Sequence, residues 1–253
     1  MLARHISHRS RDTAIIAFPA PSLRAADLHG LFAQQPILRL APGATLLWED
    51  ERASDVFEVV HGALRIFTIL GDGRRAIVRF AQPGDLIGLS CRGTYGFSIE
   101  AVSGVGVRRL ARVSFERAVE RSEDLQAELL AAVRTEATAA HQHAVLLARK
   151  NAEERVASFL LSLRDRTVKD ARQAGQAISL PMTRLDMADF LGLTLETVSR
   201  VMTRLTRAGV IAAAGRHAVA ILQPRKLKML AGEAAEGETE ISNLRQGRSH
   251  VAH

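Results

Sequence analysis

The sequence contains a single cysteine, Cys91, among its 253 residues. One thiol cannot form a disulfide within the chain, and it cannot supply the roughly four thiolates that a cysteine-ligated iron–sulfur cluster needs. No apolar run approaches the roughly 18 residues that a membrane-spanning helix requires. These absences exclude an internal disulfide framework and a cysteine-ligated cluster. They predict a protein of a reducing compartment that does not cross a membrane.

A secretory signal and the common catalytic patterns are also missing. The start, MLARHISHRSRDTAIIAFPAP, places basic residues before an apolar patch that is too short for a signal peptide, so we expect a cytoplasmic location. No Ser-His-Asp, Cys-His or phosphate-loop spacing emerges, and GDGRR at 71–75 is too short for a phosphate-binding loop. An enzyme with its active site in the N-terminal half is therefore disfavoured, and we expect no cofactor and no metal site.

Positive charge is plentiful and unevenly distributed. The chain has 34 lysines and arginines against 27 aspartates and glutamates, a formal net charge of +7. Between residues 149 and 230 there are 15 basic and 7 acidic residues, a net charge of +8, which leaves −1 for the rest. A basic C-terminal half favours an anionic partner for that half.

Residues 26–113 have the pattern of a β domain. Short apolar runs such as TLLWE, VFEVVHGALRIFTIL and RAIVRF alternate with turn signals, among them PG at 42–43, GDG at 71–73 and PGD at 83–85. Strands this closely spaced, without long helices between them, predict an antiparallel roll. Residues 1–25 lack periodicity and are predicted to be an N-terminal extension, and the polar residues 231–253 a disordered tail.

The pattern becomes helical at Ser114, which we expect to cap a short helix, and a long helix is predicted from about Ser122 to Arg149. We assign residues 114–150 to a dimerisation region. Apolar residues recur along the long helix at alternating spacings of three and four, as in a coiled-coil seam whose alanines allow close approach. The seam residues are Leu130, Val133, Ala137, Ala140, Ala144 and Leu147.

A second apolar stripe on the same helix consists of Leu125, Leu129 and Ala132, and it could pack on the roll. Both stripes together could form one broad core face within a monomer. Two adjacent stripes after a complete β domain favour a helix that serves both the roll and a second copy of the chain. The sequence therefore predicts a homodimer.

Residues 151–230 contain the run RLDMADFLGLTLETVSRVMT, which fits the helix-turn-helix pattern. Thr183 can cap the first helix in a variant capping box with Asp186, and Thr194 can cap the second. Ala188 is small where two helices would meet, and Gly192 falls at the turn, where a positive φ is commonly needed. An ordinary helical hairpin with a solvated charged face is the alternative interpretation.

The basic surroundings and the run GVIAAAGRHAVAIL, a predicted hairpin around Gly215, favour a winged helix-turn-helix that binds double-stranded DNA. The early residues of the second helix would then enter the major groove. Arg200 has the fork that matches guanine O6 and N7, and Glu196 can accept from a cytosine amino group. Ser199 can bond a base or a phosphate, and Leu195 can contact a thymine methyl. The expected phosphate contacts are Thr183, Arg184, Thr194, Arg204 and Arg207.

With these motifs together, the chain resembles the CRP/FNR superfamily of bacterial transcription regulators, most closely its FixK-like branch. The resemblance covers nearly the whole chain, including PGDLIGL in the roll and MTRLDMADFLGLTLETVSR in the helix-turn-helix. It implies an α+β fold: an N-terminal antiparallel β-roll of the cyclic-nucleotide-binding type, a long dimerisation helix and a C-terminal winged helix-turn-helix. It also implies an activator that works with RNA polymerase in low-oxygen or nitrogen-fixation programmes. By resemblance, a homodimer would recognise a TTGA-containing palindrome through Glu196, Ser199 and Arg200.

Two departures from the superfamily concern its sensors. Members that bind cyclic nucleotides hold the phosphate with a Gly-Glu-Leu run and a later Arg-Ser or Arg-Thr pair. Here Leu89 stands where the glutamate belongs, and Phe97 precedes Ser98 where the arginine belongs. A buried phosphate would lack its charge partner, so we do not expect cyclic AMP binding. The N-terminal cysteine cluster of FNR-type oxygen sensors is also absent.

Cys91 could still be a redox switch or a haem ligand, although a structural role is the alternative for a lone cysteine. A ligand-gated regulator of the same superfamily, which senses haem-bound gas or another small effector through the roll, is therefore the alternative function.

Overall fold

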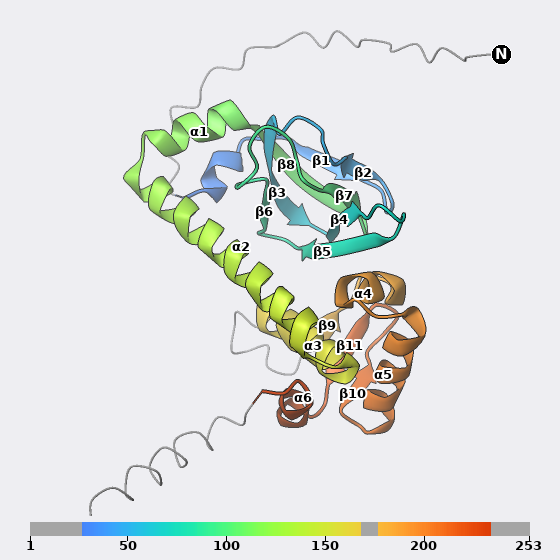
Figure 1. Ribbon diagram of the computed structural model, residues 1–253. Coiled ribbons are helices and arrows are strands. Elements are labelled where there is room, and N and C mark those ends of the chain that lie inside the picture. The colour runs from blue at the N-terminus through green and yellow to red at the C-terminus, as the bar shows by residue number, and fades with distance from the viewer. Residues whose placement is uncertain (1–26, 168–176, 234–253) are drawn as a thin grey trace, which may run out of the picture.

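The computed structural model describes residues 27–167 and 177–233, so the predicted extension 1–25 and residues 234–253 of the predicted tail lie outside the described residues. The described chain consists of a β-roll, the long helix α2 (Glu123–Arg149) and a C-terminal domain. Figure 1 shows α2 running from beside the roll to the C-terminal domain. Within these residues no helix is long and apolar enough to cross a membrane.

The roll consists of two antiparallel four-stranded sheets, with strand orders β1-β8-β3-β6 and β2-β7-β4-β5. The predicted antiparallel roll is therefore confirmed. The strands are β1 (Ile37–Leu40), β2 (Thr45–Leu47), β3 (Asp55–His61), β4 (Leu64–Ile69), β5 (Arg75–Ala81), β6 (Leu86–Ile87), β7 (Ser98–Ala101) and β8 (Val105–Ala111).

Apolar side chains from both sheets meet inside the roll, where Val59, Ile66, Ile99 and Val107 are buried in one cluster. The tight connection between β3 and β4 depends on Gly62. Its φ is +82°, and a Cβ there would lie 2.3 Å from the carbonyl oxygen of Gly104. Only glycine fits such a turn without displacing the backbone.

Helix α1 (Arg112–Glu120) begins two residues before Ser114, and its N-cap is Ala111, which has no capping side chain. The predicted Ser114 cap is therefore wrong. The Arg112 side chain explains the early start: its guanidinium donates to the carbonyl oxygens of Ala53 and Gly88, both at 2.6 Å. These bonds fix the chain at the end of β8, so tertiary contacts and not a local cap decide where the helix begins.

Helix α2 matches its predicted bounds, and the Ser122 hydroxyl accepts from the backbone N–H of Leu125 at the N-cap. Its stripe of Leu125, Leu129 and Ala132 packs on a cluster with Phe115 of α1 and Phe32 of the short 3₁₀ helix η1 (His29–Phe32). The predicted second stripe thus covers the edge of the roll, as the spacing indicated.

The C-terminal domain packs its helices around one apolar cluster. Its elements are α3 (Ala152–Thr167), β9 (Ile178–Ser179), α4 (Arg184–Leu191), α5 (Leu195–Arg207), β10 (Ile211–Ala213), β11 (Ala218–Ile221) and α6 (Pro224–Leu230). Strands β10 and β11 form the predicted hairpin, and Gly215 in its turn has φ +109°. The sequence reasoning missed α6, although Pro224 at its first position is a typical helix-start signal.

The roll and the C-terminal domain share part of this core. Phe80 of β5 lies 6.1 Å from Phe159 of α3 and 5.4 Å from Phe190 of α4, between ring centroids. His143 of α2 also stacks on Phe190, with 4.1 Å between ring centroids and an interplanar angle of 5°. Helix α4 is therefore in contact with both the roll and the long helix.

Candidate DNA-binding interface

Helix α4 is the first helix of the predicted helix-turn-helix, and its start has the predicted capping box. The Thr183 hydroxyl accepts from the backbone N–H of Asp186 at 3.0 Å, and the Asp186 carboxylate accepts from the backbone N–H of Thr183 at 3.0 Å. The helix ends at Gly192 in the left-handed conformation, with φ +61°. A residue with a side chain would be strained there, so the capping box and the glycine turn are both confirmed.

Helix α5 follows after a short turn and is capped by Thr194, whose hydroxyl accepts from the backbone N–H of Thr197. Its inner face is apolar: Val198, Val201, Met202 and Leu205 are buried. They pack with Met187, Ala188 and Leu191 of α4 in one cluster. The orientation of α5 is therefore coupled to that of α4, as the small Ala188 between them predicted.

The outer face of α5 carries the residues that we predicted to contact bases. Leu195, Glu196 and Arg200 are exposed, and Ser199 is half-buried. The exposed fraction of Leu195 is 42%, although its side chain is apolar. Arg200 forms no hydrogen bond or ion pair with any part of the chain that the structure describes, and the same holds for Arg207. Two unpaired guanidiniums two turns apart leave this face open to an anionic partner.

The remaining candidates are not equally available. The Thr183 hydroxyl donates to the Asp186 carboxylate at 2.7 Å, so its hydrogen is already used within the cap. Arg184 is half-buried, and burial lowers the pKa of its guanidinium, which lies 3.3 Å from the Met187 sulfur. Arg204 points across to Glu153 of α3, 3.4 Å away. The sequence predicted the partner of Thr183, but it could not show the burial of Arg184 or the contact between Arg204 and Glu153.

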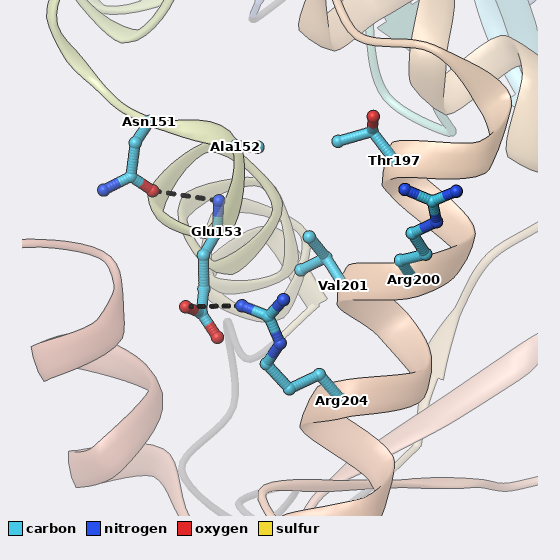
Figure 2. Close-up of a pocket in the computed structure, with 7 residues that line it drawn as sticks. All are labelled: Asn151, Ala152, Glu153, Thr197, Arg200, Val201 and Arg204. Carbon is cyan, nitrogen blue, oxygen red and sulfur yellow. Dashed lines mark hydrogen bonds and ion pairs between the residues drawn. The ribbon is translucent and has the colours of Figure 1, made fainter.

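A shallow hollow lies between α5 and the start of α3, and Figure 2 shows the side chains that line it. Asn151 caps α3, because its side-chain oxygen accepts from the backbone N–H groups of Glu153 and Glu154. The start of α3 thus borders the exposed face of α5, a neighbour that the sequence reasoning missed. The Asn151–Glu154 spacing is a capping signal that could have marked this helix start.

Arg155 connects the long helix to the turn of the helix-turn-helix. Its guanidinium donates to the carbonyl oxygens of Leu147 at 2.8 Å and of Leu191 at 2.9 Å, and its Nε donates to that of Lys150 at 2.9 Å. These carbonyls belong to the ends of α2 and α4, where helices leave such groups without internal partners.

Cys91 is half-buried against the core of the roll. Burial raises the pKa of its thiol, and the nearby Arg112 charge opposes the shift only in part. A thiol with a raised pKa stays protonated at neutral pH, and the protonated form is the less reactive one. This environment favours the structural role for Cys91.

Comparison with known proteins agrees with this geometry. A family model described as a Crp-like helix-turn-helix domain matches residues 154–230, and one described as a cyclic nucleotide-binding domain matches residues 37–122. The nitrogen fixation regulation protein FixK of Bradyrhizobium diazoefficiens is 37% identical over 210 residues, 83% of this chain and 88% of that protein. The chain belongs to the CRP/FNR family of transcription regulators.

Further relatives and a solved structure place the chain in the FixK-like branch of this family. The transcriptional activatory protein AadR of Rhodopseudomonas palustris is 39% identical, with 77% of this chain and 80% of that protein covered. The structure of FixK2 from Bradyrhizobium japonicum superposes with a TM-score of 0.72 at 36% identity, over 80% of this chain and 99% of that one. The chain is therefore a DNA-binding transcription regulator of the FixK type and not an enzyme.

Two positions of the roll that we compared with the phosphate-binding residues of cyclic-nucleotide-binding members carry apolar side chains, Leu89 and Phe97. Leu89 packs against the cluster formed with Phe115, and Phe97 packs against the core of the roll beside Tyr95. The Ser98 hydroxyl is buried and accepts from the backbone N–H of Glu49 at 3.0 Å. Apolar side chains thus occupy the two positions at which the resemblance to cyclic-nucleotide-binding members implies a glutamate and an arginine.

Adding cyclic AMP should therefore leave the DNA affinity of the protein unchanged, since burying the phosphate without a cationic partner is unfavourable. Fluorescence anisotropy titrations of labelled operator, with and without the nucleotide, measure this. A higher affinity for the operator in the presence of cyclic AMP would contradict the prediction.

Purified protein should also show no Soret absorbance, which bound haem would give.

Proposed function

We propose that the chain acts as a homodimeric activator that binds a palindromic operator with TTGA in each half-site. The observation that carries this proposal is the open face of α5, where Leu195, Glu196 and Arg200 are exposed over a buried apolar face. In a helix-turn-helix the early residues of the second helix lie in the major groove. Arg200 then bonds guanine O6 and N7, Glu196 accepts from a cytosine amino group, Ser199 bonds a base or phosphate, and Leu195 contacts a thymine methyl.

Phosphate contacts position this helix on the duplex. Arg207 is exposed and unpaired within the described residues, so it is the strongest candidate. Arg204 can contact a DNA phosphate after its ion pair with Glu153 breaks. Arg184 lies at the start of α4, where we expect a second phosphate contact. Thr194 contributes by donating its hydroxyl hydrogen to a phosphate oxygen, and Thr183 does so after releasing its hydrogen bond to Asp186. These contacts carry affinity but no sequence information.

Exposure along α2 supports the dimer. Leu130 is 50% exposed and Leu147 36%, and the alanines of the seam, Ala137, Ala140 and Ala144, are exposed as well. Val133 is half-buried beside them. An apolar stripe on a helix whose other stripe already packs on the roll matches a surface for a second copy of the chain. A two-fold dimer presents two recognition helices to two symmetric half-sites.

The names of the relatives support the setting. FixK proteins of three rhizobial species and AadR carry names of nitrogen fixation regulation or transcriptional activation. We place this regulator in low-oxygen or nitrogen-fixation gene control, in the cytoplasm where bacterial DNA lies, with RNA polymerase as the partner of activation.

Selection of bound DNA from a random pool tests the proposal directly. The enriched sequences should form a palindrome with TTGA in each half, and sedimentation of the protein should give the mass of a dimer. Enriched sequences without two-fold symmetry would overturn the homodimeric arrangement, and no enrichment over random DNA would overturn sequence-specific binding.

A further inference from the structure

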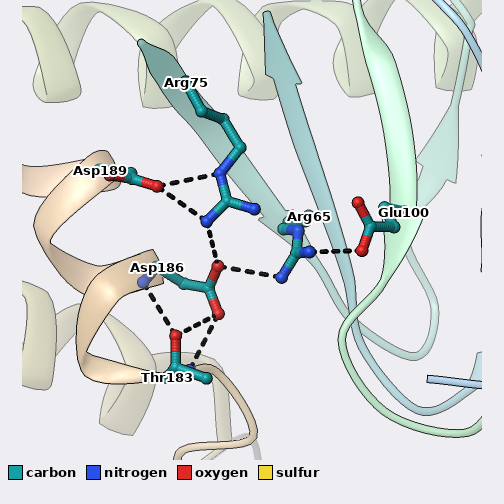
Figure 3. Close-up of polar contacts among 6 residues, drawn as sticks. All are labelled: Arg65, Arg75, Glu100, Thr183, Asp186 and Asp189. Atoms are coloured by element: carbon teal, nitrogen blue, oxygen red, sulfur yellow. Dashed lines mark hydrogen bonds and ion pairs between the residues drawn. The ribbon is translucent and has the colours of Figure 1, made fainter. Parts of the chain in front are cut away.

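The Asp186 carboxylate serves two parts of the molecule at once. Its Oδ2 atom caps α4, where it accepts from the Thr183 N–H and hydroxyl groups. Its Oδ1 atom accepts from two arginines of the β-roll, Arg65 Nη1 at 3.0 Å and Arg75 Nη2 at 2.8 Å. Figure 3 shows both guanidiniums converging on this carboxylate from the strands of the roll. The residue that completes the capping box of the first helix of the helix-turn-helix is thus held by another domain.

The surrounding contacts hold the two arginines in place. Arg65 of β4 is also paired with Glu100 of β7, and Arg75 of β5 lies 5.9 Å from the centroid of the Phe67 ring. Arg75 Nε additionally donates to Asp189 Oδ2 at 2.9 Å, one turn further along α4. The Asp186 side chain is 1% exposed. Buried ion pairs with this many hydrogen bonds have a narrow range of geometries.

The other end of α4 is held by rings. Phe190 packs on Phe80 of the roll, and His143 of α2 stacks on Phe190 while its Nε2 atom lies 2.8 Å from the Phe190 carbonyl oxygen. Contacts at both ends leave α4 little freedom to pivot against the roll or the long helix. Because α5 packs on α4 through buried side chains, the recognition helix is held as well.

We propose that Arg65 and Arg75 are positioning residues for DNA recognition, which hold the recognition helix at the distance from the dimer axis that the operator's half-site spacing requires. This inference rests on the proposed dimer and its palindromic operator. The centres of two half-sites lie about 34–36 Å apart, and each base pair adds about 3.4 Å along the axis. A recognition helix displaced by about the length of one base pair would miss its half-site while the other recognition helix of the dimer is bound.

The docked arrangement leaves the DNA-contacting face accessible. Glu196, Arg200 and Arg207 are exposed while Asp186 and Asp189 are paired with the roll. The arginine pair therefore does not cover the exposed face of α5, and it acts on α4, to which we assign phosphate contacts but no base contacts. Its loss should weaken binding to two correctly spaced half-sites and leave contacts to a single half-site intact.

The test uses Arg75→Glu in the full-length protein, since a glutamate there faces two aspartates of α4. The matched control is Arg74→Glu, the same charge change at an exposed side chain that pairs with Asp72 inside its own turn. Anisotropy titrations use the palindrome, a duplex with one half-site scrambled, and palindromes with one base pair added or removed between the half-sites. Arg75→Glu should bind the palindrome about tenfold or more weakly, because a second recognition helix that misses its half-site adds no linked binding to the first.

The same variant should bind the single half-site as the unchanged protein does and should lose discrimination between spacings, whereas Arg74→Glu should resemble the unchanged protein. Adding Asp189→Arg to Arg75→Glu restores an opposite pair and should recover most of the lost affinity. Unchanged affinity and spacing preference in Arg75→Glu would overturn the inference. Tighter binding of this variant to the palindrome would also overturn it, because the docked arrangement would then oppose DNA binding. Loss of single half-site binding would mean damage to the fold, and Arg75→Gln then decides by the same spacing series. If the unchanged protein shows no preference for two half-sites over one, the proposed function fails instead.

Discussion

Ala140→Glu should convert the dimer into monomers and abolish tight operator binding. Ala140 lies at the centre of the apolar stripe on α2 and is exposed in the single chain. In the proposed dimer the two glutamates would face each other. Two like charges about 6 Å apart repel by about 3 kcal/mol at an effective dielectric constant of about 20. Burying each carboxylate costs about several kcal/mol more.

A destabilisation of about 4 kcal/mol already raises the dissociation constant of the dimer roughly a thousandfold. Sedimentation equilibrium at micromolar concentration measures the mass, and anisotropy measures operator binding. The matched control is Ala139→Glu, the same substitution at the neighbouring exposed alanine, which lies off the seam. An intact Ala140→Glu dimer would show that α2 does not pair through this stripe, and equal effects of both variants would indicate damage to the helix and not to a seam.

Local signals in the sequence predicted the helix-turn-helix well because its constraints are local. Gly192 must adopt a left-handed conformation, Ala188 must be small, and Thr183 and Thr194 must offer a hydroxyl at a helix start. Each requirement involves residues a few positions apart. The bounds of α2 followed from the same kind of reasoning, since Ser122 caps the helix before a long periodic pattern.

What the sequence could not predict depends on residues far apart in the chain. Asp186 was recognised as a cap, yet its second role requires Arg65 and Arg75, which lie 121 and 111 positions away. The start of α1 was misplaced for the same reason, because Arg112 binds carbonyl groups 24 and 59 positions away. Neither pattern of contacts has a sequence period, so only the fold brings these groups together.

The structure also separates the arginines of α5, which look alike in the sequence. Arg200 and Arg207 are unpaired within the described residues, whereas Arg204 lies 3.4 Å from Glu153. If Arg200 binds guanine bidentately, Arg200→Ala should weaken operator binding by about 1–3 kcal/mol per half-site and relax preference at one base pair. Two symmetric half-sites in a dimer double that loss.

Arg207→Ala should act differently, because a phosphate contact carries no sequence information. It should weaken binding to the operator and to random DNA alike, and it should lower the salt slope by about one unit for each phosphate that is no longer neutralised. Both variants remove one positive charge from the same helix, so general electrostatics cannot distinguish them. Titrating each against the palindrome and against duplexes changed at the guanine measures the discrimination. If Arg200→Ala kept full discrimination while Arg207→Ala lost it, the helix would lie in the groove with its other end toward the bases, and the proposed contacts would be wrong.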